Sequence, residues 1–338
     1  MNQAKWVVIV LAAMAVVGCT KKEASAPAAE ETAAVETEKP AAPTEPILPL
    51  PDSADVDMDK VLLGRSLYFD TALSGDGTVS CATCHMLEHG GAEPRKTSIG
   101  IGGQIGPINS PTVLNSSYNF VQFWDGRAKD LQEQAAGPVE NPSEMGAKWE
   151  NVVKRLAKNE EYAAAFAKLY EDGITKDNAT DAIAEYEKSL ITPSRFDAYL
   201  KGDDTAITDA EKQGYATFKE VGCTACHSGI NVGGAMFQKL GLVKDYFKDR
   251  GTEITEADLG RFNVTKNEAE KHFFKVPTLR NVELTSPYLH DGSRATLEET
   301  VKVMGTYQLG RELTAAQVNS IVTFLKTLTG TLPAHAKP

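Results

Sequence analysis

The chain has 338 residues, of which 42% are hydrophobic and 24% are charged, and this composition is typical of a globular protein long enough for two domains. Its formal net charge of −11 argues against nucleic acid as a partner and identifies no substrate. Four of its five cysteines fall into two short motifs described below, so we expect no disulfide framework.

Residues 1–18 are typical of a secretory signal. Lys5 supplies the positive start, and the apolar run Trp6–Val17 is too short to span a bilayer. The stretch Val16-Val17-Gly18-Cys19 resembles a bacterial lipoprotein signal, in which cleavage leaves Cys19 as a lipidated N-terminus. We therefore expect a protein on the periplasmic side of a bacterial membrane, which it would contact only through the lipid on Cys19.

Residues 19–50 are expected to form a disordered tether. The stretch Thr20–Pro46 is almost entirely Ala, Glu, Pro, Thr and Lys, and it has no periodic apolar positions with which to form a core. Helical periodicity begins near residue 50. We predict an N-terminal domain over residues 51–203, a C-terminal domain over residues 204–330, and a tail over residues 331–338.

Each predicted domain begins with a helix in which a glycine is followed four residues later by an aromatic residue, at Gly64 and Tyr68 and again at Gly214 and Phe218. Apolar periodicity and capping boxes indicate further helices. These signals lie at 149–156, 183–190, 208–211, 296–299 and 314–328. Because no sustained alternation of apolar and polar residues is present, we expect a mainly α fold with long irregular loops.

The most specific signal is a C-x-x-C-H run that occurs twice, as Cys81-Ala82-Thr83-Cys84-His85 and as Cys223-Thr224-Ala225-Cys226-His227. Two thiols on one turn can form thioethers to one porphyrin while the adjacent imidazole ligates its iron. A disulfide at each motif, or a four-thiolate zinc site built from both, would leave the two histidines unexplained. We therefore predict two covalently bound c-type haems, each following a glycine-containing helix that resembles the first helix of class I cytochromes c.

The two irons differ in the sixth ligand that the sequence offers. For the second haem the candidate is Met304, although a core methionine on the helix face of Leu297 and Val301 is the competing interpretation. A His/Met iron suits electron transfer. In the first half, Met86 adjoins the proximal ligand and His89 follows that ligand too closely to reach the opposite face. We therefore expect an open position at the first iron.

An open haem needs acid–base groups beside it if it is to react with a small molecule. Two candidates lie in the stretch Gln134–Gly146: Gln134 is its first residue, and Glu144 lies two residues before its end. Two prolines and two glycines make this stretch rigid. A glutamate on a loop is usually solvated, and nothing in the local sequence excludes that interpretation here.

Taken together, these features resemble the bacterial dihaem cytochrome c peroxidases from about Leu50 to Gly330. The stretches that carry the resemblance are Gly106–Asn115, Phe123–Ala128, Gly137–Gly146, Val276–Asn281, Pro287–Gly292 and Gln308–Arg311. The resemblance implies reduction of hydrogen peroxide to water with electrons from a small cytochrome c or a similar donor. Members of this family often form homodimers, which the resemblance leaves open for this chain.

The resemblance also implies a role for each haem. His85 would be the proximal ligand of a peroxidatic N-terminal haem, with Glu144 and Gln134 lining its distal pocket. Glu144 would move a proton between the peroxide oxygens, and Gln134 would orient peroxide. His227 and Met304 would hold the electron-accepting C-terminal haem.

Two features between the domains are implied in the same way. Trp124 would lie between the haems on the electron path, and a place in the interdomain core is compatible with that role. A calcium ion would be held by the side-chain oxygen of Asn109 and the carbonyls of Thr285 and Pro287, which are the oxygen donors that this hard cation requires.

The sequence departs from the family at one position. Many members carry a histidine in the loop after the first haem motif, where it binds the resting peroxidatic iron, and counting along the similar loop places Ile101 there. Isoleucine cannot ligate iron. We expect the first haem to be five-coordinate or water-bound when oxidised, and the alternative is that another group fills the position.

Two other functions remain open. A dihaem enzyme that oxidises residues of a partner protein would carry tyrosine in place of Met304. A plain dihaem electron carrier would need both irons to be six-coordinate, which the open first position and the Gln134–Glu144 pair disfavour.

Overall fold

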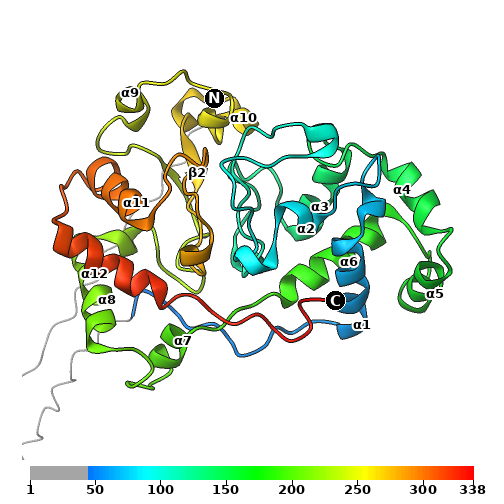
Figure 1. The fold of residues 1–338 in the computed structure, drawn as a ribbon, viewed down its shortest axis with the longest axis horizontal. Coiled ribbons are helices and arrows are strands. Elements are labelled where there is room, and N and C mark those ends of the chain that lie inside the picture. The colour runs from blue at the N-terminus through cyan, green and yellow to red at the C-terminus, as the bar shows by residue number, and fades with distance from the viewer. Residues whose placement is uncertain (1–44) are drawn as a thin grey trace, which may run out of the picture. The chain divides into compact units, whose positions relative to one another are not determined.

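The computed structural model describes residues 45–338. The predicted signal, the lipid site at Cys19 and most of the predicted tether lie outside the described residues. Within residues 45–338 the fold is mainly helical, as expected, and none of the helices there is long and apolar enough to cross a membrane (Figure 1).

We refer to residues 51–203 as the N-terminal half and to residues 204–330 as the C-terminal half; the division into two domains stays a prediction. The helices of the first half are α1 (Met58–Phe69), α2 (Cys81–Cys84), α3 (Leu131–Glu140), α4 (Trp149–Leu156), α5 (Glu160–Leu169), α6 (Lys176–Ser189) and α7 (Arg195–Leu200). Those of the second half are α8 (Asp209–Val221), α9 (Tyr246–Arg250), α10 (Phe262–Thr265), α11 (Leu297–Val303) and α12 (Ala315–Lys326). Two short antiparallel strands, β1 (Phe237–Lys239) and β2 (Phe273–Lys275), pair so that Phe237 lies opposite Lys275.

The three helices of the second half that the sequence marked with capping boxes begin where those boxes predict. Thr208, Thr296 and Thr314 precede α8, α11 and α12, and each exchanges side-chain and backbone hydrogen bonds with the residue three positions on. Each box satisfies backbone N–H groups that the first helical turn leaves without partners. Local sequence alone therefore determines where these helices start.

The glycine of each early helix allows a second helix to cross closely. A Cβ on Gly64 would overlap the carbonyl oxygen of Ala182 on α6, and a Cβ on Gly214 would overlap that of Ser320 on α12. Only glycine permits such an approach of two backbones. The same local pattern thus produces the same crossing ahead of each haem motif, with α6 as the partner in one half and α12 in the other.

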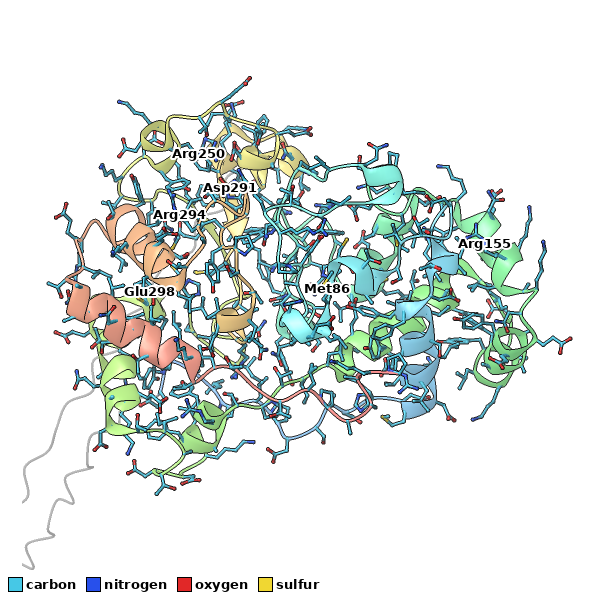
Figure 2. All side chains as sticks on the ribbon, in the orientation of Figure 1. Met86, Arg155, Arg250, Asp291, Arg294 and Glu298 are labelled. Carbon is cyan, nitrogen blue, oxygen red and sulfur yellow. The ribbon has the colours of Figure 1, made fainter. Side chains whose placement is uncertain are left out.

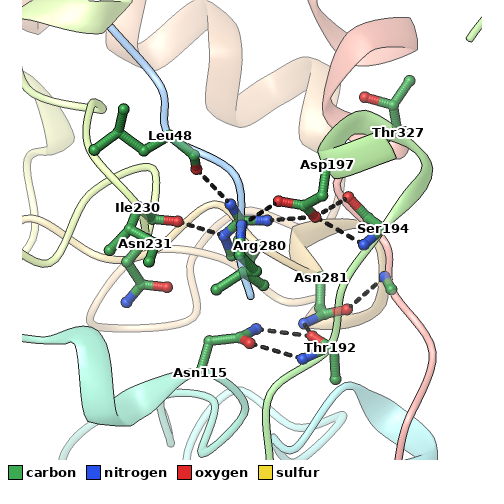
Figure 3. A network of polar contacts seen from close by, with 12 residues as sticks. Leu48, Asn115, Thr192, Ser194, Asp197, Ile230, Asn231, Arg280, Asn281 and Thr327 are labelled. Atoms are coloured by element: carbon green, nitrogen blue, oxygen red, sulfur yellow. Dashed lines mark hydrogen bonds and ion pairs between the residues drawn. The ribbon is translucent and has the colours of Figure 1, made fainter. Parts of the chain in front are cut away.

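A second repeat joins the two halves. Asn115 and Asn281 occupy the same place after Pro111 and Pro277, and both have left-handed backbones with φ of 58° and 60°. Both side-chain amides donate to the hydroxyl of Thr192, which lies in the segment between α6 and α7 (Figure 3). This hydroxyl is therefore shared by equivalent positions of the two halves.

The predicted tether extends too far into the chain. Residues Glu45–Leu50 are packed against the C-terminal half, where Ile47 is 1% exposed and forms a β-bridge with Gly229, and Leu50 is 0% exposed. The fully buried Arg280 donates to the carbonyl of Leu48 (Figure 3). The correction has a tertiary cause, because the apolar surface that receives Ile47 belongs to residues more than a hundred positions away.

The tail is also part of the fold. Leu332 and the buried Ala336 pack into the core beneath α1 and α6, and the hydroxyl of Tyr186 donates to the Ala336 carbonyl at 2.6 Å. Figure 1 shows the C-terminus beside α1. The chain therefore returns to the N-terminal half after completing the C-terminal one.

Candidate functional site

The first C-x-x-C-H motif places its two thiols on the single turn of α2, with His85 directly after it. Nδ1 of His85 lies 3.0 Å from the carbonyl oxygen of Pro111. Burial lowers the pKa of His85, so the ring is neutral and donates Nδ1–H to that carbonyl. Nε2 then carries the free lone pair that a haem iron needs.

The second motif repeats this arrangement. His227 is buried, its Nδ1 lies 3.3 Å from the carbonyl oxygen of Val232, and burial lowers its pKa to about 4. A Cβ on Gly233 would overlap the Pro277 carbonyl, so the backbone passes closely beside this ring. Because both histidines are neutral and oriented through Nδ1, the residues at both motifs fit c-type haem.

Met304 follows the last residue of α11 and begins a π-helical turn, Met304–Gln308. It packs against the buried cluster formed by Tyr246, Phe247, Phe274 and Val303. Single π-helical turns are frequent at functional sites. The ligation of iron by Met304 stays a prediction.

Glu144 lies in the loop that follows α3, where Asn141 ends the helix and its Nδ2 donates to Glu144 Oε1 at 2.6 Å. Burial raises the pKa of Glu144, although the charge of Arg127 and the bond from Asn141 act in the opposite direction. Gln134 lies seven residues before Asn141 and so on the same helix face. Among residues 45–338 its side chain makes no hydrogen bond to Glu144.

Several carboxylates act on the first haem motif. Burial raises the pKa of the Cys81 thiol to about 12 and that of Cys84 to about 11; the charge of Glu187 adds to the first shift and that of Glu93 to the second, and Glu144 makes a smaller contribution to both. The pKa of Cys223 is raised by burial too, but within the described chain no carboxylate contributes there. Acidic surroundings therefore distinguish Cys81 and Cys84 from Cys223.

Ile101 contacts the backbone of this same loop. Its N–H donates to the carbonyl oxygen of Glu144 at 2.7 Å. The position that the family resemblance associates with a histidine is thus occupied by a side chain without a ligating atom, beside the candidate acid–base residue. The coordination state of the first iron stays a prediction.

Trp124 connects the two halves. Its indole Nε1–H donates to the carbonyl of Asn109 at 2.9 Å, and its own carbonyl accepts from the N–H of Lys275 on β2 at 2.8 Å. The ring also meets Phe274 and His290 edge-on, with centroids 6.3 and 6.5 Å apart. These contacts place Trp124 between residues of the N-terminal half and residues of the C-terminal half, and its role in electron transfer stays a prediction.

The three predicted calcium ligands come from two loops that contact each other. The N–H of Asn109 donates to the His290 carbonyl at 2.8 Å, and Thr285 and Pro287 lie just before His290 in the chain. Nδ2 of Asn109 donates to the Arg95 carbonyl at 3.1 Å, which leaves the amide oxygen free for a cation. This all-oxygen donor set fits calcium.

A buried polar cluster beside Trp124 was not predicted. Nε2 of His290 lies 2.7 Å from Oδ1 of Asp258, and Arg250 pairs with both Asp258 and Asp291 (Figure 2). The His290 ring stacks on Phe274 with centroids 4.5 Å apart. No role was predicted for His290. Asp258 and Arg250 are not predictable from the sequence, because isolated charged residues in an irregular stretch form no pattern. Asn141 was also not predicted, although the Asn-Pro pair after a helix is a usable signal.

Comparisons with known proteins identify the family. Residues 58–205 match a family model described as di-haem cytochrome c peroxidase. The chain is 51% identical over 288 residues to cytochrome c peroxidase Ccp of Escherichia coli (strain K12), covering 85% of this chain but only 61% of that relative's length. It is 49% identical over 299 residues to the cytochrome c551 peroxidase of Nitrosomonas europaea, covering 88% of each.

A solved structure agrees with these relatives. The crystal structure of a MauG-like protein associated with microbial copper homeostasis matches with a TM-score of 0.73 and 28% identity, over 86% of this chain and 95% of that one. The chain carries two haem motifs with oriented histidines, and it is about 50% identical to proteins named cytochrome c peroxidases. It therefore belongs to the di-haem cytochrome c peroxidase family, which is a family of peroxidases.

Proposed function

We propose that this protein reduces hydrogen peroxide to two waters with two electrons from a small cytochrome c or a similar donor. Peroxide would react at the N-terminal haem, and electrons would enter at the C-terminal haem. The observation that carries this assignment is the position of Glu144, a half-buried carboxyl that Asn141 holds by a hydrogen bond and whose charge reaches Cys81 and Cys84. No carboxylate acts on Cys223 within residues 45–338.

When bound, haem iron supplies the redox chemistry and the place where peroxide binds. Glu144 would accept a proton from one peroxide oxygen and return it to the other, so that the leaving oxygen departs as water. Burial raises the pKa of Glu144, which moves it in the direction that suits a carboxyl that must both accept and release a proton. Over the whole reaction one H2O2, two electrons and two protons give two H2O, and Gln134 would help to orient the substrate.

The remaining parts of the proposal concern electron supply and location. His227 and Met304 would hold the accepting haem in a class I cytochrome c-like domain, and Trp124, which is hydrogen-bonded to both halves, would lie on the electron path. Calcium would hold the loops of Asn109 and Pro287 together. A lipid on Cys19 would anchor the protein on the periplasmic side of a bacterial membrane.

Steady-state oxidation of a reduced small cytochrome c by hydrogen peroxide tests the proposal. We expect turnover by the wild-type protein and a loss of at least about 100-fold in the Glu144→Gln variant, with both haem spectra unchanged. Glu140→Gln is the matched control, because Glu140 is exposed on the last turn of α3. Wild-type rates in Glu144→Gln, or no turnover by a wild-type protein that carries both haems, would contradict the proposal.

The structure offers no observation in favour of the partner-oxidising alternative. That function would call for tyrosine as a ligand of the second haem, and the hydroxyl of Tyr307, in the turn that Met304 begins, donates instead to Asp249 at 3.3 Å. Cyanide binding to one haem would separate the peroxidase from a plain electron carrier.

A further inference from the structure

Ile101 lies where three segments of the N-terminal half meet. These are the flap Ser98–Gly106, the Glu144 loop Asn141–Ala147 and the turn that ends at Gly75. The N–H of Ile101 donates to the Glu144 carbonyl at 2.7 Å. Its side chain points at two glycines, since a Cβ on Gly75 would lie 3.1 Å from Ile101 Cδ1 and a Cβ on Gly146 would lie 3.1 Å from Cγ2.

The flap is a closed hairpin that rests on the Glu144 loop. The N–H of Gly106 donates to Ser98, and that of Gly100 donates to Gln104, both at 2.8 Å. A Cβ on Gly100 would overlap the carbonyl oxygens of Ser143 and Glu144, so the two backbones touch there. The far side of the hairpin is open to solvent, where Ile105 is 74% exposed.

Two backbone carbonyl groups of the Glu144 loop accept hydrogen bonds from the neighbouring segments and so hold the loop in place. The Glu144 carbonyl accepts from Ile101, and the Met145 carbonyl accepts from the N–H of Gly75 at 2.7 Å. Gly75 and Gly146 approach each other closely, and the side chain of Ile101 packs beside this contact and so against both segments. A change at Ile101 therefore acts on the loop that carries the Glu144 carboxyl.

The flap brings no charge to Glu144. None of the residues from Ser98 to Gly106 is titratable, and Glu144 is the single titratable residue of its own loop. Among the described residues the charged group that acts on Glu144 is Arg127, which comes from another segment. Glu144 acts on the thiols of Cys81 and Cys84, which would be thioethers in the protein that carries both haems.

We propose that Ile101 is a positioning residue for Glu144: its side chain is an apolar latch that seats the flap on the Glu144 loop and shields the carboxyl group from water. The inference rests on the proposed proton-transfer role of Glu144. At a position where a histidine could bind iron, this chain would use packing to keep the flap in place.

The test compares Ile101→Ala with two controls in the protein that carries both haems. Ile101→Val keeps the branched side chain, and Ile105→Ala removes an exposed isoleucine from the same flap. The first readout is hydrogen exchange of the flap peptide, and the second is the pH profile of peroxide turnover. If Ile101→Ala does not fold, Ile101→Thr keeps a β-branched side chain, removes Cδ1 and introduces a hydroxyl that attracts water.

We expect Ile101→Ala to exchange its flap amides about tenfold faster or more, since these amides depend on local opening. The acidic limb of its pH profile should move to lower pH, because a hydrated carboxyl loses a proton more readily. Ile105→Ala should retain wild-type behaviour, and Ile101→Val, which loses Cδ1 but keeps Cγ2, should lie between the wild type and Ile101→Ala. If Ile101→Ala shows unchanged hydrogen exchange and an unchanged acidic limb, the latch is overturned, even where Glu144→Gln abolishes turnover. Normal turnover by Glu144→Gln would instead overturn the proposed function itself.

Discussion

Asn115 and Asn281 each donate a side-chain amide hydrogen to the Oγ1 atom of Thr192, both at 2.8 Å. All three residues are fully buried. Asn115 lies four residues after Pro111, whose carbonyl accepts from the proximal His85, and Asn281 has the same place after Pro277. One hydroxyl thus connects equivalent segments of the two halves, each of which follows a proline beside a histidine of a haem motif.

Replacing Thr192 by Val should destabilise the protein. The change keeps the branched shape but leaves two buried amide groups without an acceptor, and each such group costs ~1–3 kcal/mol. Thermal unfolding of the variant, monitored through both haem absorbances, should show a lower midpoint. Thr192→Ser restores the hydroxyl and is the control; equal midpoints for Val and Ser would contradict the shared role of this oxygen.

Arg280→Met should have a larger effect than any single surface charge. The guanidinium is 0% exposed and pairs with Asp197 at 3.0 Å, so its removal leaves a buried carboxylate without its cation. Breaking a buried pair from one side typically costs ~3–5 kcal/mol. Lys201→Met removes the partner of the exposed Asp52 and should change the unfolding free energy by less than ~0.5 kcal/mol. Comparable losses of unfolding free energy in Arg280→Met and Lys201→Met would show that burial of the ion pair does not decide how much its removal destabilises the protein.

Arg127→Gln should move the acidic limb of peroxide turnover to higher pH. Burial raises the pKa of Glu144, and the Arg127 charge partly offsets that shift. Without the cation the carboxyl holds its proton to higher pH, so the base form that begins the reaction is lost earlier as pH falls. The pH dependence of turnover measures this, with the exposed Lys129→Gln as control. A shift in the opposite direction would exclude Arg127 as a source of the effect.

The oxidised protein should contain one high-spin haem and should turn over without prior reduction, because Ile101 offers no ligand for iron. Low-temperature EPR of the fully oxidised protein measures the spin states directly. Steady-state assays that begin with oxidised or half-reduced enzyme provide a second measurement, in which both forms should start without a lag. Two low-spin signals, or a lag that pre-reduction removes, would mean that another group fills the position.

The sequence alone determined the features that depend on neighbouring residues. Both haem motifs place two thiols and a histidine within five residues, and the capping boxes at Thr208, Thr296 and Thr314 require partners only three positions away. The close helix crossings at Gly64 and Gly214 were predictable too, because the absence of a Cβ is a property of the residue itself. Such features are visible in sequence because they are completed within one or two turns of chain.

Only the tertiary structure decided the rest. Burial of Ile47 and Ala336, the pairing of His290 with Asp258, and the contact between Ile101 and the Glu144 loop all join segments that are distant in the chain or lie on irregular loops. Local composition suggested a tether up to residue 50 and a tail after Gly330, and residues 45–50 and the tail both pack into the fold because apolar surface and hydrogen-bond partners reach them from elsewhere. A carboxyl group becomes shielded, and its pKa rises, only when distant backbone covers it, and no local pattern in the sequence records that contact.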